Sequence, residues 1–259
     1  MGEHRARVLE YLRGIALPFR SVAGTIIEER GLAEADRLML RPNLVMWACR
    51  ACDGDADAIG DALPVAAAFD LFDRFMLLHD ELVEEDEVTA LAGERSACSV
   101  VARWGLGQSL NAGDALYAMA LRVLAQDVGN AERRLRVASL VTRAVLEAIE
   151  GRTSDTERGP NGRESSGLLV RVRSVRRRSA ALTGAALEAG ALIANADAGV
   201  CRGFRRAGRL LAAAVNSRDP GLAARLSSKA VASIERSIPE HAHLEGFENL
   251  ARHVATRAA

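Results

Sequence analysis

Apolar side chains recur every three or four residues through most of this chain, the spacing that places them on one face of a helix. The alternation that marks a half-buried strand is rare. Clusters rich in glycine, proline, asparagine and aspartate interrupt the helical pattern, most clearly at 52–55, 128–130 and 219–221. The predicted helices span 5–29, 41–52, 57–83, 96–104, 107–127, 130–151, 165–197, 199–216, 221–238 and 244–257. We therefore predict an all-α protein.

The predicted helices are expected to form one domain over residues 1–259. No linker separates halves of different composition, and no internal repeat is present. A chain of 259 residues is long enough to bury a sizeable core in one domain. Aromatic residues make up only 4% of it, so alanine, leucine and valine should form most of that core. The expected architecture is a single-domain helical bundle.

Charge and hydropathy exclude several classes of function. The 34 basic and 34 acidic residues balance, and the arginine-rich run at 171–178 has no interleaved aromatic residues, so we exclude a nucleic-acid partner. No apolar stretch reaches the roughly 18 residues of a membrane span. The segment that follows Met1 is amphipathic and unlike a signal sequence. With four cysteines and no disulfide framework, we expect a reduced, cytoplasmic protein.

The candidate chemistry lies in the acidic run His79–Asp86, which directly follows the apolar Phe75–Leu78. Asp80 and Glu84 are four residues apart, so a helix places both carboxylates on one face. Like charges that close repel unless a cation lies between them, and Mg²⁺ binds carboxylates together with water and substrate phosphate. The run therefore predicts a magnesium site suited to an apolar diphosphate. A solvated helix end explains the same residues, and the run by itself allows both interpretations.

Six short motifs follow one another along the chain. They read Leu38–Pro42, Asp80–Glu84, Glu94–Ser99, Trp104–Leu116, Gly151–Asp155 and Arg178–Leu182. In this order, from about residue 36 to the C-terminus, the chain resembles the trans-isoprenyl diphosphate synthases, or polyprenyl synthetases, of the isoprenoid synthase superfamily. The resemblance implies the helical bundle of that superfamily, Mg²⁺ as cofactor and an allylic prenyl diphosphate as substrate.

The resemblance also implies roles for individual residues. The implied metal ligands are the acidic residues at motif positions, namely Asp80, Glu81, Glu84, Asp155 and Asp219. The residues implied to bind the substrate diphosphate are the arginines Arg41, Arg95 and Arg178, of which Arg95 and Arg178 are also the implied catalytic residues. Phe75, with Met76 beside it, resembles the floor of the family's prenyl pocket. A bulky side chain there would restrict the pocket to a short prenyl chain.

The chain departs from the family where isopentenyl diphosphate and the second metal cluster would bind. Leu38 stands where the family has a lysine, and Glu94 stands where it has an arginine. Of the aspartates of the second motif only Asp219 remains, and the loop expected after about residue 221 is shortened. These changes disfavour the condensation of two diphosphates.

Three functions remain open at this point. The first is a terpene-synthase-like lyase that ionises one allylic prenyl diphosphate with Mg²⁺ and releases pyrophosphate, although the second metal triad of such enzymes is missing near 216–235. The second is a short-chain trans-prenyltransferase that condenses an allylic diphosphate with isopentenyl diphosphate. The third is a non-catalytic family member that binds a prenyl diphosphate or partners an active synthase. The resemblance implies a homodimer or a heterodimer with a related synthase.

Overall fold

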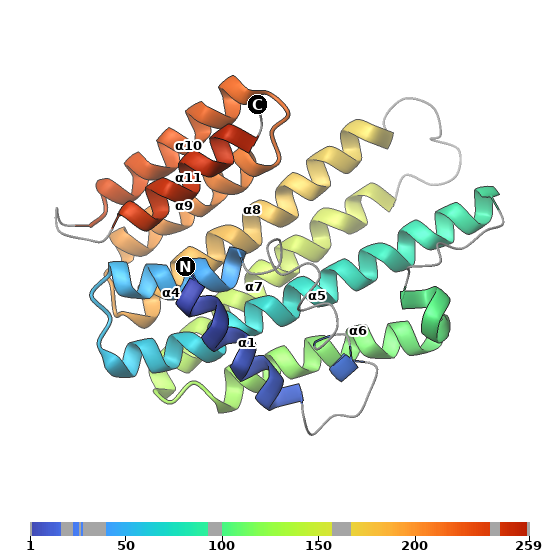
Figure 1. The fold of residues 1–259 in the computed structure, drawn as a ribbon, viewed down its shortest axis with the longest axis horizontal. Coiled ribbons are helices and arrows are strands. Elements are labelled where there is room, and N and C mark those ends of the chain that lie inside the picture. Colours follow the sequence, from blue (N-terminus) through green and yellow to red (C-terminus); the bar gives the residue numbers. More distant parts are fainter. Residues whose placement is uncertain are drawn as a thin grey trace.

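The computed structural model describes residues 2–16, 23–25, 27, 40–92, 100–156, 167–238 and 244–257. Every regular element in these ranges is a helix, which confirms the predicted all-α class. In chain order the helices are α1 (Gly2–Ala16), α4 (Leu40–Ala51), α5 (Ala56–Ala92), α6 (Val100–Gln126), α7 (Ala131–Thr156), α8 (Gly167–Ile193), α9 (Ala198–Val215), α10 (Pro220–Glu235) and α11 (Glu245–Arg257) (Figure 1).

Helix α8 is central to the packing, because it contacts α4, α5, α7 and α9. On one side of it, α9 packs against α10 and α11, and these three helices form the orange and red group at the upper left of Figure 1. On the other side, α5 packs against α6, α4 and α1. This arrangement brings α5 and α8, which carry most of the predicted site residues, into direct contact.

The middle of α5 lies inside the protein. Every residue in 65–72 is buried, and Phe69 and Phe72 are among the largest fully buried side chains. A helix that is apolar around most of its circumference is surrounded by other elements. Within the described ranges, no helix is long and apolar enough to cross a membrane. Helix α5 is thus the internal support from which the acidic motif extends.

Most predicted helix boundaries agree with the structure to within a few residues. The helix predicted over 5–29 corresponds to α1 as far as Ala16, and most of its remainder lies outside the described residues. Two other predictions differ in kind. The helix predicted over 57–83 continues to Ala92, because the acidic residues after the apolar stretch extend the helix instead of ending it. The helices predicted over 96–104 and 107–127 are joined in α6, where Gly105 has φ 78° and ψ 161° and kinks the element. Glycine adopts this backbone conformation without the strain that a side chain would add.

Aspartates cap the first turns of α5 and α9. At the start of α5, Asp55 Oδ1 accepts a hydrogen bond from the Ala58 N–H at 2.7 Å. At the start of α9, Asp197 Oδ1 accepts from the N–H groups of Gly199 and Val200 at 2.6 and 2.9 Å. These hydrogen bonds hold the pKa of Asp197 below its ordinary value. Both carboxylates satisfy backbone donors that have no partner within the helix.

Helices α4 and α8 approach closely at Gly190. A Cβ atom added there would lie 2.6 Å from Ala48 Cβ and 2.9 Å from Cys49 N, well inside van der Waals contact. We expect Gly190→Ala to lower the free energy of unfolding by about 1–3 kcal/mol, as overpacking does in other cores. Chemical denaturation measures this change.

The matched control is Gly60→Ala in α5, where an added Cβ would meet nothing within 4 Å. Alanine is the better helix former, so this variant should gain up to about 1 kcal/mol of stability. Changes of the same sign and size in the two variants would contradict the close approach of α4 and α8.

Candidate active site

Asp80 and Arg178 form an ion pair that joins α5 to α8. Arg178 Nη1 donates to both carboxylate oxygens of Asp80, at 2.5 Å from Oδ1 and 2.8 Å from Oδ2. The side chain of Arg178 is 15% exposed and that of Asp80 is 28% exposed, so solvent reaches the pair. The sequence predicts Asp80 as a metal ligand and Arg178 as a diphosphate ligand, and the structure places them in contact. One position thus offers both a cation for phosphate and a carboxylate for a metal.

Two turns earlier on α5, Asp73 is paired with an arginine from another helix. Arg41 Nη1 donates to Asp73 Oδ1, and Arg41 Nε donates to Thr183 Oγ1 of α8 at 3.2 Å. Burial raises the pKa of Asp73 to about 6, while the Arg41 guanidinium acts in the opposite direction. Arg41, which the sequence predicts at the substrate diphosphate, is therefore engaged by α5 and α8.

A third ion pair lies within α5 itself. Arg74 Nε donates to Asp70 Oδ2 at 2.5 Å, and the two side chains are 2% and 0% exposed. Burial raises the pKa of Asp70, and the nearby Arg74 opposes this rise. A charge this deep is costly unless an opposite charge accompanies it. The pair is a structural feature of the core next to the candidate site.

Aromatic side chains form the apolar part of the site. The ring of Phe75 lies 4.6 Å from that of His79 and 5.3 Å from that of Tyr117 on α6, measured between centroids. Met76 is buried, with 8% of its surface exposed. A Cβ added at Gly113 of α6 would collide with the His79 ring, so this glycine allows α6 to approach α5. Phe75, one of the two predicted pocket residues, thus lies at the α5–α6 contact, about one turn before Asp80.

Asp219, a predicted metal ligand that precedes α10, has a structural partner. Its Oδ1 accepts a hydrogen bond from the Leu222 N–H at 3.1 Å and caps α10, which begins at Pro220. Gly208 of α9 allows close packing on α8, because a Cβ there would lie 2.8 Å from the Gly184 Cα. Asp219 therefore serves as the N-cap of a helix in this structure.

Helix α9 presents arginines toward its neighbours. Arg205 pairs with Glu188 of α8 through Nε and Nη2. Arg209 Nη2 donates to both carboxylate oxygens of Glu147 on α7, at 2.6 and 2.7 Å. These two pairs join α9 to α8 and α7.

Part of the predicted site lies outside the described residues. Arg95 falls there, and so do the side chains of Glu84 and Asp155, although both positions belong to helices. Among the side chains that are described, no three histidine, cysteine, aspartate or glutamate residues converge on a position where they could hold a metal. Asp80 and its half-buried neighbour Glu81 are the described acidic residues of the first motif. The roles of Arg95, Glu84 and Asp155 stay predictions.

Asp73 and Thr183 were not predicted as partners of Arg41. One signal was available: Asp73 lies seven residues before Asp80, so a helix places both carboxylates on the same face. An acidic residue inside an apolar helix also needs an opposite charge or hydrogen bonds when it is buried. Neither signal identifies which arginine supplies the charge, because that depends on how α4 packs on α5.

Comparison with known proteins identifies related sequences. A family model described as polyprenyl synthetase matches residues 34–220 of the chain. The geranylgeranyl diphosphate synthase of Mycobacterium tuberculosis is 34% identical over 181 residues, which cover 69% of this chain and 48% of the relative. The chain thus spans about half the length of these curated relatives, which include a geranylgeranyl diphosphate synthase of Methanosarcina mazei.

Solved structures show the same fold. The geranylgeranyl pyrophosphate synthetase from Pyrococcus horikoshii matches with a TM-score of 0.80 at 18% identity, over 98% of this chain and 96% of that chain. A deletion mutant of the heterotetrameric geranyl pyrophosphate synthase from mint matches with a TM-score of 0.71 at 18% identity, over 96% and 97% of the two chains. These likenesses confirm the predicted isoprenoid-synthase type of helical bundle.

Proposed function

Because this chain belongs to the polyprenyl synthetase family, we propose that it binds one allylic prenyl diphosphate between α5 and α8 and ionises it with Mg²⁺, releasing pyrophosphate. The observation that carries the proposal is the solvent-accessible pair of Asp80 and Arg178. The Asp80 carboxylate is suited to bind a hard cation such as Mg²⁺, and the Arg178 guanidinium is suited to bind the phosphate oxygens of the substrate.

The acidic residues of the first motif, on α5, are suited to hold one Mg²⁺ ion. Magnesium is commonly held by one or two carboxylates, with water and substrate phosphate as the other ligands. Asp80 would supply the first carboxylate, and Glu84, four residues further along α5, is the second ligand that the sequence predicts. When bound, the ion neutralises the charge that develops on the departing pyrophosphate. Asp219 caps α10, so we do not include it among the ligands.

Arg178 has two consecutive roles in this proposal. In the present structure its Nη1 atom balances the charge of Asp80. When a diphosphate binds, the same guanidinium would donate to the phosphate oxygens and keep them beside the carboxylate. Charge-assisted donors that are already in place stabilise a developing anion with little reorganisation. Arg178 is therefore the proposed catalytic residue on α8, and Arg95 stays the predicted one outside the described residues.

The apolar cluster beside the pair is the proposed location of the prenyl chain. Phe75 is half-buried and packs against Tyr117, while Met76 is buried beneath the α5 surface. The rings of Phe75 and Tyr117 would form the floor of the prenyl pocket, within a few carbon atoms of the diphosphate. The proposal therefore favours a short allylic substrate.

The state of Arg41 supports a reaction with one diphosphate instead of two. Its guanidinium is engaged by Asp73 and Thr183, so a second diphosphate would have to compete with a buried carboxylate. The pairing adds to the loss of the family's lysine at Leu38. Both features should lower the affinity of the protein for isopentenyl diphosphate.

Replacing Asp73 by asparagine should make Arg41 available to bind isopentenyl diphosphate. Asp73→Asn removes the charge that holds Arg41, so the affinity for isopentenyl diphosphate at pH 8 should rise about tenfold or more, the worth of a hydrogen bond to a charged group. The pKa of Asp73 is raised to about 6, so the wild-type carboxylate becomes neutral as the pH falls below 6. The wild-type protein should then approach the variant at pH 5.5. Isothermal titration calorimetry at both pH values measures this difference.

Asp114→Asn is a suitable control, because Asp114 is exposed on α6. This variant should bind isopentenyl diphosphate as weakly as the wild-type protein at pH 8. If Asp73→Asn and Asp114→Asn bind it equally at pH 8, Asp73 does not control Arg41.

The experiment that tests the proposed function is pyrophosphate release. Geranyl, farnesyl and geranylgeranyl diphosphates are each incubated with the protein and Mg²⁺, without isopentenyl diphosphate, and pyrophosphate is followed by a coupled assay. We expect release from at least one allylic substrate and none when Mg²⁺ is chelated. The absence of release from all three substrates by folded protein would contradict the ionisation reaction.

The names of the relatives favour a second candidate function. The matched relative from Mycobacterium tuberculosis is named as a geranylgeranyl diphosphate synthase. A short-chain trans-prenyltransferase would require Arg41 to leave Asp73 when isopentenyl diphosphate binds. Pyrophosphate release that depends on added isopentenyl diphosphate would identify this function.

A third candidate is a partner subunit without catalysis of its own, favoured by the capping role of Asp219. One surface suits a partner: Leu77 of α5 and Leu106, Leu110 and Leu121 of α6 are each more than one third exposed. Exposed leucines on adjacent helices are typical of subunit interfaces. We propose that this surface pairs two copies of the chain, or this chain with a related synthase, as the heterotetrameric mint enzyme pairs unlike subunits.

A further inference from the structure

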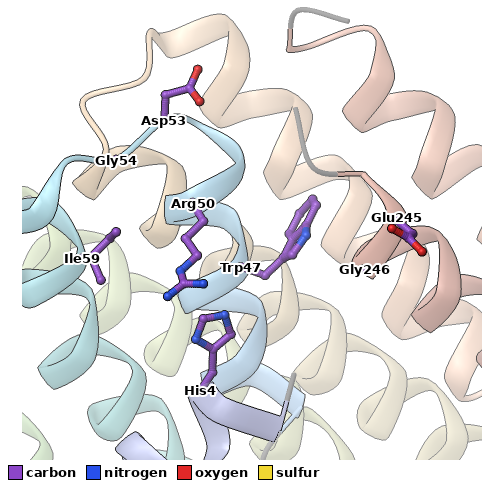
Figure 2. Close-up of a pocket in the computed structure, with 8 residues that line it drawn as sticks. All are labelled: His4, Trp47, Arg50, Asp53, Gly54, Ile59, Glu245 and Gly246. Carbon is purple, nitrogen blue, oxygen red and sulfur yellow. The ribbon is translucent and has the colours of Figure 1, made fainter. Parts of the chain in front are cut away.

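A separate cavity of about 590 Å³ lies at the other end of α4 from Arg41. Residues from α1, α4, the α4–α5 turn, α5 and α11 line it, so five parts of the chain converge there (Figure 2). The rise of an α-helix places Arg50, near the end of α4, about 14 Å along the axis from Arg41. The cavity has the size of a site for a small organic molecule.

The inner part of the cavity is cationic. Arg50 and His4 extend into it, with Ile59 on one side and Trp47 on the other (Figure 2). The Nε atom of Arg50 is buried without a hydrogen-bond partner, while His4 is only 8% exposed. A buried N–H donor without an acceptor is unfavourable, so an anion that enters the cavity would satisfy it. Gly246, in the first turn of α11, adds a helix end with amides suited to an anion.

The cavity also offers an apolar wall that is held rigidly in place. The Trp47 ring stacks on Phe204 and Phe247, with centroids 6.0 and 5.0 Å apart. Gly246 of α11 lies next to this ring, since a Cβ there would be in ordinary contact with the indole at 3.4 Å. Ile59 is the other apolar residue in the lining. A flat or branched hydrocarbon group would fit between these two side chains.

Two carboxylates at the exposed edge limit the charge of the ligand. Asp53 and Glu245 are exposed residues of the lining, on opposite sides of the cavity in Figure 2. They would repel a diphosphate or another multiply charged anion that approached Arg50. A single negative charge on an otherwise apolar molecule meets the arginine with the least repulsion from the edge.

From these features we propose that the cavity binds a small monocarboxylate with an apolar body. Its carboxylate would accept hydrogen bonds from Arg50, beside His4, and its apolar body would pack between Trp47 and Ile59. This site would be independent of the diphosphate site, because Asp80 lies 21 residues beyond Ile59, or about 32 Å along α5.

The test uses the full chain and three probes in isothermal titration calorimetry. The probes are 3-phenylpropionate, its neutral analogue 3-phenylpropan-1-ol, and inorganic pyrophosphate. We expect one molecule of 3-phenylpropionate to bind per chain, with no binding of the alcohol at the same concentrations and no competition from pyrophosphate. Equal binding of acid and alcohol, or competition by pyrophosphate, would overturn the proposal.

Two variants locate the binding. Arg50→Gln should weaken the binding of 3-phenylpropionate about tenfold or more, as the loss of a charged hydrogen-bond donor does. Arg206→Gln, which changes an exposed arginine of α9, is the matched control and should bind as the wild-type protein does. Equal affinities in the two variants would overturn the role of Arg50.

A third variant keeps the test decisive if Arg50→Gln fails to fold. Ile59→Phe leaves the arginine in place and fills the apolar side of the cavity, so it should also weaken the binding of 3-phenylpropionate. Thermal melts establish that each variant is folded. Asp80→Asn should bind the acid normally, and a loss of binding in this variant would show that the acid occupies the diphosphate site instead.

Discussion

Asp80→Asn should slow pyrophosphate release from an allylic prenyl diphosphate by roughly 10²–10³-fold, the usual effect of removing one group that stabilises charge in a transition state. The substitution keeps the shape of the side chain and removes the charge that would hold Mg²⁺. It also removes the carboxylate that now orients Arg178 through two hydrogen bonds. Steady-state rates at saturating Mg²⁺ measure the loss.

The control for this prediction lies on the same helix. Asp57→Asn changes an exposed aspartate in the first turn of α5, about 35 Å from Asp80 by the rise of the helix. Its rate should equal that of the wild-type protein. If the two variants have the same rate, Asp80 is not a ligand of the reacting diphosphate or its metal.

Arg74→Ala should lower the free energy of unfolding by about 3–5 kcal/mol, the cost of leaving one member of a buried ion pair without its partner. Asp70 is completely buried, and Arg74 is its hydrogen-bonded cation. Burial already raises the pKa of Asp70, and loss of Arg74 would raise it further. The native variant then binds a proton more tightly than the unfolded chain does, so the deficit should shrink as the pH falls. Urea denaturation at pH 8 and pH 5 measures both effects.

Two further variants separate charge from packing. Arg206→Ala removes an exposed arginine and should change stability by less than about 0.5 kcal/mol. The double variant Asp70→Leu with Arg74→Met removes both charges and should recover most of the stability lost in Arg74→Ala, because apolar residues of similar volume commonly replace a buried ion pair without loss. A double variant as unstable as Arg74→Ala would show that packing, not the unpaired charge, causes the deficit.

The helices could be predicted from the sequence because their causes are local. Apolar spacing marks each buried face, and short clusters of glycine, proline and aspartate mark the breaks. The continuation of α5 to Ala92 was missed, because an acidic run was interpreted as the end of a helix. The kink at Gly105 was interpreted as a gap between two helices, although a single glycine with a positive φ is sufficient for it.

The site could be predicted only in part, since it combines residues that are far apart in the sequence. The resemblance to a known family suggested both Asp80 and Arg178, and the contact between them follows from the packing of α5 on α8. The Arg41–Asp73 pair has no local signature, because it depends on the position of α4. Asp219, in contrast, has a local signature, because an aspartate directly before a proline is a common helix start. The structure shows this role.

The central claim is that this chain ionises one allylic diphosphate without a second. The most direct test gives the protein farnesyl diphosphate, Mg²⁺ and radiolabelled isopentenyl diphosphate, and measures both the pyrophosphate released and the label in extracted prenyl products. We expect pyrophosphate release with no label in the products. Label that enters a longer prenyl chain, in proportion to the pyrophosphate released, would instead establish condensation of two diphosphates.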